Sequence, residues 1–338
     1  MKRYLLAVAT LLAIGATAGA QDLTGAGSSF AAPIYNKWAG PYAAKTGVKI
    51  NYQSVGSGTG IKQISEMTVD FGATDGPMTD EQMDAAKGGP IIHIPTVIGA
   101  VAISYNLASV SEHLKLTGPV VADIFLGTIT NWNDSRIKAL NPGVTLPDKP
   151  IVVVHRSDGS GTTYIVTDYF SNVSPGWAKG PGKGTAIAWP VGLGAKGNEG
   201  VAGQVRQVDG AIGYVELAYV LTNHMAYALL QNKDGKYVAP SLEGATAAAA
   251  GTAAKLPANS DFRISIVNAP GAASYPISSF TWILMYKHQS DAAKGHKLVD
   301  FITWAMEHGD ADAASLQYAT LPKNMKAMVL KRLKDVTY

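Results

Sequence analysis

The sequence contains no cysteine. This absence excludes disulfide bonds and cysteine-based metal sites, and it removes the lipid-modified cysteine that anchors many exported binding proteins. Charged residues are also scarce, at 16% of the chain, whereas glycine occurs 36 times. Little charge combined with much glycine is typical of a tightly packed α/β protein with many loops, and it does not indicate a disordered chain.

Several signatures of enzymes are also missing. The seven histidines show no spacing that would hold a metal ion. There is no Gly-x-Ser-x-Gly motif, and residues 182–185 lack the earlier glycine and the preceding strand of a phosphate-binding P-loop. We therefore expect no metal, no cofactor and no catalytic activity.

The chain has one apolar run near its start, and no comparably long apolar run follows it. Lys2 and Arg3 precede an apolar stretch at residues 4–16 that is too short for a permanent membrane anchor, and Ala20 ends a sequence that matches a signal peptidase site. We expect residues 1–20 to be a signal peptide and the mature protein to be free in the periplasm without a lipid anchor. Without Lys2 and Arg3 the formal charge falls from +3 to +1, so charge does not indicate nucleic acid or a membrane as a partner.

The most informative stretch is residues 152–163. Its β-branched residues predict a strand that runs to Arg156, and the pattern of residues 164–170 predicts a helix after a Gly-Ser-Gly turn. The first turn of a helix offers unpaired N–H groups and the positive end of the helix dipole, which suits an anion. Ser160 and Thr162 add hydroxyl donors, and Arg156 adds a planar guanidinium that fits oxyanions. The alternative is an ordinary turn in which Ser160 caps the helix.

A similar strand, glycine-serine turn and helix occurs twice more. Near the start of the mature chain, a strand is predicted to end at Gly25, and Ser28 or Ser29 is predicted to cap a helix over residues 31–44. Pro41 predicts a kink or an early end of that helix. Further on, residues 48–52 predict a strand that leads into a Gly-Ser-Gly turn containing Ser57, followed by another helix.

Asp75 follows a predicted strand at residues 69–74, and open α/β sheets bind ligands at the carboxyl ends of their strands. A carboxylate repels a fully ionised anion and accepts from one that still carries a proton. Phosphate keeps at least one proton near neutral pH and sulfate has none, so an ionised Asp75 favours phosphate. The alternative is a turn carboxylate beside the helix whose capping box lies at residues 79–82. Asp158 is expected either to hold Arg156 in place or to cap the following helix.

Two long apolar stretches, residues 94–105 and 275–286, predict strands that cross between domains. Strand–helix units lie on both sides of them, so we predict an α/β protein of two lobes with the ligand cleft between them. Residues 21–95 and 276–338 are predicted to form the first lobe, and residues 96–275 the second. The alanine-rich residues 245–254 predict a plain surface helix.

The candidate ligand-binding residues together supply hydroxyls, backbone N–H groups at helix starts, one guanidinium and one carboxylate. A small tetrahedral oxyanion consists almost entirely of hydrogen-bond acceptors, and all of them must be satisfied when it is buried. The candidates are Ser29, Phe30, Ser57, Asp75, Arg156, Ser160, Gly161 and Thr162.

Residues 25–33, 69–75, 156–162, 189–194 and 210–216 resemble, in this order, segments of the periplasmic phosphate-binding proteins of high-affinity phosphate ABC transporters. The resemblance implies a type II periplasmic binding protein fold that closes on inorganic phosphate and delivers it to membrane permease subunits. It also implies that the eight candidates contact the ligand, Phe30 through its backbone N–H. Position 29 is often threonine in this family, and Ser29 keeps the hydroxyl.

Other functions stay open at this stage. The chain is expected to be a monomeric, non-catalytic binding protein, and another oxyanion that carries a proton, such as phosphite, is an alternative ligand. A phosphate-ester hydrolase that uses Ser160 or Ser57 as its nucleophile is a further alternative. We expect no base within reach of either serine, which argues against the hydrolase.

Overall fold

The computed structural model describes residues 22–253, 256–257 and 259–338, so the predicted signal peptide lies outside the described residues. The strands are β1 (Leu23–Gly27), β2 (Ile50–Ser54), β3 (Phe71–Thr74), β4 (Ile91–Tyr105), β5 (Lys115–Leu116), β6 (Val152–Arg156), β7 (Leu193–Ala195), β8 (Ala211–Glu216), β9 (Ala226–Tyr227), β10 (Leu229–Gln231), β11 (Tyr237–Val238), β12 (Ser278–Tyr286) and β13 (Ala319–Thr320).

Helices connect most of these strands, as expected for an α/β fold. They are α1 (Ala32–Thr46), α2 (Ser57–Ser65), α3 (Asp80–Asp84), α4 (Gly118–Phe125), α5 (Ser135–Leu140), α6 (Gly161–Val173), α7 (Pro175–Lys179), α8 (Gly197–Gln207), α9 (Leu217–Thr222), α10 (Leu242–Ala253), α11 (Ala292–His308), α12 (Asp310–Ser315) and α13 (Lys323–Leu333). Among the described residues, none of these helices combines the length and hydropathy that crossing a membrane requires.

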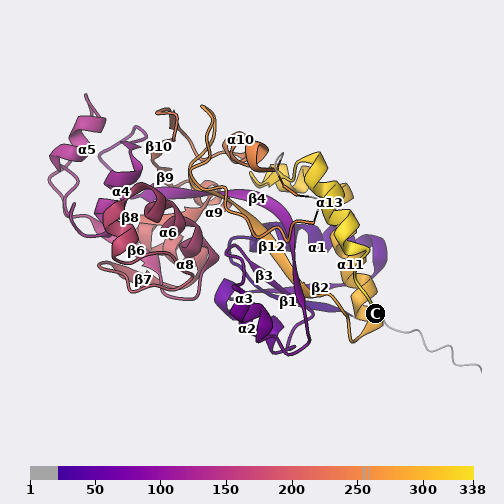
Figure 1. Ribbon diagram of the computed structural model, residues 1–338. Helices are drawn as coiled ribbons and strands as arrows, with labels where there is room; N and C mark the ends of the chain where they lie inside the picture. The colour runs from indigo at the N-terminus through magenta and orange to yellow at the C-terminus, as the bar shows by residue number, and fades with distance from the viewer. Residues whose placement is uncertain (1–21, 254–255, 258) are drawn as a thin grey trace, which may run out of the picture.

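The main sheet has the strand order β2-β1-β3-β12-β4-β8-β6-β7. Residues 91–100 of β4 pair along β12, and residues 101–105 of the same strand pair with β8. β4 therefore belongs to both halves of the sheet. We call β1–β3 with α1, α2 and α11 the first lobe, and β6–β8 with α4, α6 and α8 the second lobe. Figure 1 shows β4 running from the first lobe into the second, which confirms the prediction of two lobes and of a strand that crosses between them.

Pro41 does not end α1, so the predicted early end of this helix is wrong. The helix continues to Thr46 and stops at Gly47, whose φ of 77° is left-handed. Pro41 lies on the exposed face of α1, where water can solvate the carbonyl left without its usual backbone donor. On the opposite face, Tyr35 and Trp38 are among the buried core residues. Their burial stabilises the helix more than the proline weakens it.

The alanine-rich segment is not a plain surface helix. In α10, Ala245, Ala248 and Ala249 are at most 1% exposed, and the helix packs against β4 and β12. Alanine side chains are small enough for the helix to approach the sheet closely. At Gly244 the approach is closer still, because a Cβ there would lie 2.9 Å from the Cβ of Tyr275.

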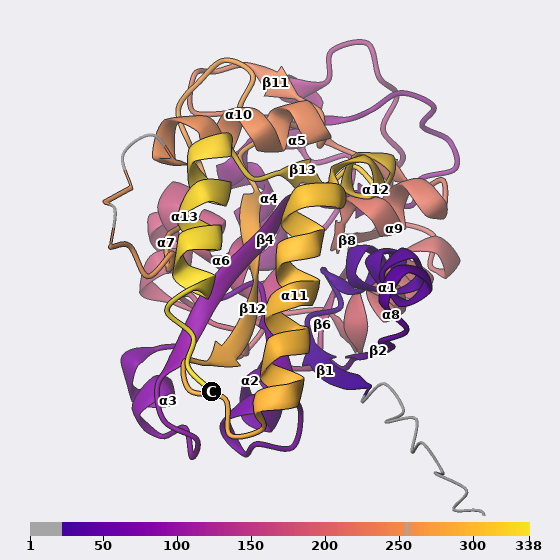
Figure 2. The ribbon, with the colours of Figure 1, turned by 90° about the vertical axis from the view of Figure 1, so that its right-hand side faces the viewer.

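Smaller differences concern element ends. β1 extends to Gly27, two residues beyond its predicted end. The capping box at Thr79 and Gln82 is confirmed. Figure 2 shows α11 crossing the sheet near β1 and β4.

Candidate functional site

Two of the predicted glycine-serine turns face each other across the lobes. The N–H of Gly58, in the first turn of α2, donates to the carbonyl of Gly159, just before α6, at 2.9 Å. A Cβ on Gly58 would lie 3.0 Å from the Cα of Gly159, and a Cβ on Gly161 would lie 2.6 Å from the hydroxyl of Ser57. Only glycine allows this approach, so the start of α2 and the start of α6 meet at one point.

Asp75 follows β3 and is 1% exposed. Ser28 Oγ lies 2.6 Å from both carboxylate oxygens, Thr281 Oγ1 lies 2.7 Å from Oδ1, and Ser57 Oγ lies 3.3 Å from Oδ2. Burial raises the pKa of Asp75 to about 6, although the hydrogen bonds from Ser28 and Thr281 and the charge of Arg156 act to lower it. Asp75 is thus a buried carboxylate whose close partners are hydroxyls.

Arg156 ends β6 and is 3% exposed. Its Nε donates to Asp158 Oδ1 at 2.7 Å and one terminal nitrogen donates to Oδ2 at 2.5 Å, while the other terminal nitrogen reaches Thr162 at 3.3 Å. Asp158 therefore holds the guanidinium in a bidentate pair, which is the first of its two predicted roles. Burial acts to raise the pKa of Asp158, but the hydrogen bonds and charge of Arg156 outweigh it and keep the pKa below its ordinary value.

Ser160 caps α6, because its hydroxyl oxygen accepts from the N–H of Thr163 at 3.0 Å. The capping role proposed as an alternative at this position is thus confirmed. It leaves the hydroxyl proton available, since a serine oxygen accepts and donates at the same time. The cap and a ligand-binding role are therefore compatible.

Three tyrosine hydroxyls fix the turn that precedes α1. Tyr52 donates to the carbonyl of Ser28 at 2.7 Å, Tyr219 to that of Ser29 at 2.7 Å, and Tyr318 to that of Phe30 at 2.6 Å. In a planar trans peptide the carbonyl and the following N–H point in opposite directions. The N–H groups of Ser29 and Phe30 consequently point away from the hydroxyls of Tyr52 and Tyr219.

The structure brings the eight candidates together at this junction. Seven of them are at most 3% exposed and Gly161 is also buried, so the two lobes are closed over them. The ring of Phe30 packs edge-on against Tyr318 in the core, which leaves its backbone to face the site. One expectation is wrong: Asp75 lies within hydrogen-bond distance of Ser57, so a possible base is in reach of that serine.

Sequence reasoning missed several residues that shape the site. Ser28 or Ser29 was predicted to cap α1, and this prediction is wrong, because Ala31 is the N-cap of the helix and no side chain caps it. Thr281 is a polar residue inside the apolar strand β12. Asn198 is the second residue of α8, is fully buried and contacts both Ser29 and Thr162. A polar residue inside an apolar run, and an asparagine after a glycine at a helix start, are the signals that could have drawn attention to two of them.

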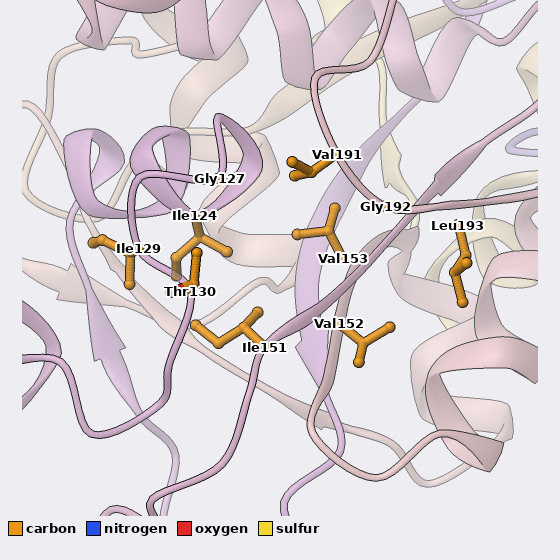
Figure 3. A pocket seen from close by; sticks show the side chains of 10 residues that line it. All are labelled: Ile124, Gly127, Ile129, Thr130, Ile151, Val152, Val153, Val191, Gly192 and Leu193. Carbon is orange, nitrogen blue, oxygen red and sulfur yellow. The ribbon is translucent and has the colours of Figure 1, made fainter.

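The pocket in Figure 3 is of a different kind. It has a volume of about 280 Å³, lies beside the edge strand β7 and contains none of the eight candidates. Its side chains are mainly aliphatic, among them Ile124, Ile151 and Val153, so it offers few donors to an oxyanion. Within the described ranges, no group of three or more histidine, aspartate or glutamate residues is placed to hold a metal ion.

Comparison with known proteins agrees with this architecture. Residues 14–307 match the family described as a PBP superfamily domain. The chain is 47% identical over 304 residues to the phosphate-binding protein PstS of Xylella fastidiosa strain 9a5c, which covers 90% of this chain and 82% of that protein. It is 42% identical to the PstS protein of Haemophilus influenzae, with 98% and 97% covered.

Solved structures show the same fold at lower identity. A phosphate-binding protein from Stenotrophomonas maltophilia superposes with a TM-score of 0.70 at 22% identity, covering 92% of this chain and 94% of that one. A high-affinity periplasmic phosphate-binding protein bound with phosphate superposes with a TM-score of 0.73 at 21% identity, covering 91% and 93%.

Proposed function

The chain belongs to the PstS family of phosphate-binding proteins within the PBP superfamily, and on this premise we propose that it binds inorganic phosphate for uptake by an ABC transporter. The bound anion lies between Asp75 and Arg156, where the starts of α1, α2 and α6 converge. The permease subunits of the transporter are its partners. The observation that carries the proposal is the buried Asp75, whose carboxylate accepts hydrogen bonds from the hydroxyls of Ser28, Ser57 and Thr281.

A buried carboxylate beside three helix starts is unfavourable for most anions. Its negative charge repels a fully ionised ligand, and a site without water leaves that repulsion poorly screened. A phosphate ion can donate its remaining proton to Asp75 and replace repulsion by a charge-assisted hydrogen bond. Sulfate has no proton to donate at neutral pH. Asp75 thus selects ligands that carry a proton and rejects those that do not.

The remaining candidates supply donors. Hydroxyls come from Ser29, Ser57, Ser160 and Thr162, and backbone N–H groups come from Phe30 and Gly161. Arg156 presents the terminal nitrogen that is not bonded to Asp158. Because Asp158 offsets the charge of Arg156, the donor set holds an oxyanion without a large excess of positive charge. This balance suits a site that must also release its ligand to a permease.

Phosphite remains the alternative ligand, because it also carries a proton. For the hydrolase alternative, Ser57 and Asp75 are the pair to consider. The contact of 3.3 Å between them is longer than the contacts that Asp75 makes with Ser28 and Thr281, so the carboxylate is oriented mainly by other residues. We therefore propose that the protein binds and does not hydrolyse, and incubation with an aryl phosphate should release no phenol.

Export and assembly complete the proposal. We propose that residues 1–20 are removed as a signal peptide, and that the mature chain acts in the periplasm as a monomer without nucleic acid. The lobes formed by residues 21–95 with 276–338 and by residues 96–275 close on the ligand. Ser29 approaches from the first lobe, and Arg156 and Thr162 approach from the second.

Calorimetric titration of the mature protein tests the proposal. The protein is first unfolded, dialysed and refolded to remove bound anions, and is then titrated with phosphate, phosphite and sulfate near neutral pH. We expect micromolar or tighter binding of phosphate, at least about 8 kcal/mol, and no binding of sulfate. Equal binding of phosphate and sulfate would contradict the role of Asp75, and tighter binding of phosphite would reassign the ligand.

A further inference from the structure

We propose that Asn198 is a positioning residue that makes the hydroxyls of Ser29 and Thr162 obligatory hydrogen-bond donors to the anion. This inference rests on the proposed phosphate-binding function and deepens it. Asn198 is fully buried at the start of α8.

The start of α8 is anchored to the arginine end of the site. Gly197 adopts a left-handed φ of 73°, and its N–H donates to Asp158 Oδ1 at 3.1 Å. Asp158 is the residue that holds Arg156. The backbone of Asn198 therefore has a fixed position relative to the guanidinium, with the side chain between the two lobes.

The orientation of the Asn198 amide is determined by Glu216. The backbone N–H of Glu216 can only donate, and it donates to Asn198 Oδ1 at 2.9 Å. The oxygen of the amide consequently faces β8, and the NH₂ group faces the site. Its nitrogen lies 3.0 Å from Ser29 Oγ and 3.0 Å from Thr162 Oγ1, so each of its two protons has one hydroxyl oxygen to meet.

A hydroxyl has one proton and two acceptor lone pairs. Ser29 Oγ accepts from the backbone N–H of Asn198 at 3.1 Å as well as from its amide. Thr162 Oγ1 accepts from Arg156 at 3.3 Å and from the same amide. In both residues the lone pairs are used by N–H donors. The proton is what remains, and it must point to another acceptor, which the anion supplies.

Ser28 shows the opposite arrangement. Its oxygen accepts from the N–H of Ala31 at 3.0 Å, and its proton is given to Asp75. The two neighbouring serines therefore donate their protons to different groups. Ser28 donates to the Asp75 carboxylate, and Ser29 is free to donate to the ligand. Asn198 produces this difference, because its backbone N–H and its side-chain amide donate the two hydrogen bonds that Ser29 Oγ accepts.

Replacing Asn198 by aspartate is the sharpest test. N198D preserves the shape but replaces the NH₂ group by an oxygen, which would accept the protons of Ser29 and Thr162 and withdraw them from the ligand. We expect phosphate affinity to fall by about 100-fold near pH 8, as for a buried hydrogen-bonded group whose partner is lost. Binding by N198D within threefold of the wild-type affinity would overturn the inference.

N141D is the matched control. Asn141 is also buried, at 5% exposed, and its amide bonds the backbone of Lys115 and Ile137 away from the site. Both variants introduce a buried carboxyl group and both are expected to lower the melting temperature. Only N198D is expected to change phosphate affinity, and N141D should stay within twofold of the wild type.

A mutant cycle separates positioning from general support of the fold, and it does not require N198D to fold. We expect N198A to weaken phosphate binding about 10-fold in the wild-type background, and less than about twofold when Ser29 and Thr162 are both already alanine. An equal loss in both backgrounds would show that Asn198 does not act through these hydroxyls. Absence of phosphate binding by the wild type itself would instead overturn the proposed function, so the two failures are distinguishable.

Discussion

Asp75 and Arg156 occupy equivalent places, at the carboxyl ends of β3 and β6, and both are almost fully buried. Their partners differ. Arg156 is paired with the carboxylate of Asp158, whereas Asp75 receives hydrogen bonds from the hydroxyls of Ser28, Ser57 and Thr281. The charge of Arg156 is offset by the opposite charge of Asp158. The Asp75 carboxylate is hydrogen-bonded, but no opposite charge is paired with it.

This difference assigns the two ends different tasks. The carboxylate of Asp158 holds the guanidinium of Arg156 in one orientation through two hydrogen bonds. Burial raises the pKa of Asp75 to about 6, so this carboxyl group changes between its neutral and charged forms close to physiological pH. We propose that the arginine end supplies affinity for any oxyanion and that the aspartate end decides which oxyanion is accepted.

Removing the arginine should have the largest effect on affinity. R156M deletes the charged donor and leaves the partly buried Asp158 without its partner, so phosphate binding should weaken about 1,000-fold, on the order of 4 kcal/mol. Calorimetry measures this change. R136M is the matched control, because Arg136 also pairs with an aspartate two residues away, Asp134, but on the surface. A loss below tenfold for R156M would contradict the importance of this end.

Removing the charge of Asp75 should change selectivity more than affinity. D75N keeps the shape and offers an NH₂ donor, so sulfate should now bind, and the ratio of phosphate to sulfate affinity should fall by about 100-fold. D168N is the control, because Asp168 is a buried carboxylate that bonds Ser265 and Lys183 outside the site. Continued rejection of sulfate by D75N would show that selection does not depend on this carboxylate.

The same reasoning predicts a pH dependence for sulfate binding by the wild-type protein. Above the pKa of about 6, Asp75 is ionised and must take up one proton before sulfate can bind. Sulfate should therefore begin to bind only as the pH falls toward 6, with an affinity that rises about tenfold for each unit of pH decrease and levels off below pH 6. Titrations at a series of pH values measure the slope. A slope of the same size in D75N would assign the proton to another group.

The smallest effect concerns stability. Glu216 is fully buried, its Oε2 accepts from the N–H of Ala218, and its Oε1 has no partner among the described residues. Burial raises the pKa of Glu216 to about 8, so folding favours the neutral acid, and stability is lost as pH rises from about 4.5 through 8.

E216Q removes this titration. It should be about 1–2 kcal/mol more stable than the wild type near pH 8.5 and no more stable near pH 4.5, as measured by urea unfolding. Glu199 is exposed, and E199Q serves as the control. A stability difference that does not change with pH would mean that Glu216 does not titrate in this range.

The parts of the site that local sequence determines could be predicted. The starts of α2 and α6 are each marked by a Gly-Ser-Gly sequence after a predicted strand, and Arg156 and Asp75 lie at predicted strand ends. The support of the site could not be predicted in this way. Tyr52, Tyr219 and Tyr318 bond three successive carbonyls but come from distant parts of the chain, and no local pattern relates them.

Local rules also failed where packing outweighs them. Pro41 is a helix breaker, yet α1 continues because the opposite face buries large side chains. The alanines of α10 have no apolar stripe of large residues, yet they are buried because small side chains allow close approach to the sheet. In both segments, contacts with distant parts of the chain determine the structure, and helix propensity alone does not predict those contacts.

A crystal structure of the mature protein with phosphate at about pH 8 would show directly where the anion lies. We expect one phosphate between Asp75 and Arg156, with one oxygen within hydrogen-bond distance of the Asp75 carboxylate and the others bonded to the hydroxyls of Ser29 and Thr162. A phosphate bound elsewhere, or one in this cleft that does not contact Asp75, would contradict this expectation.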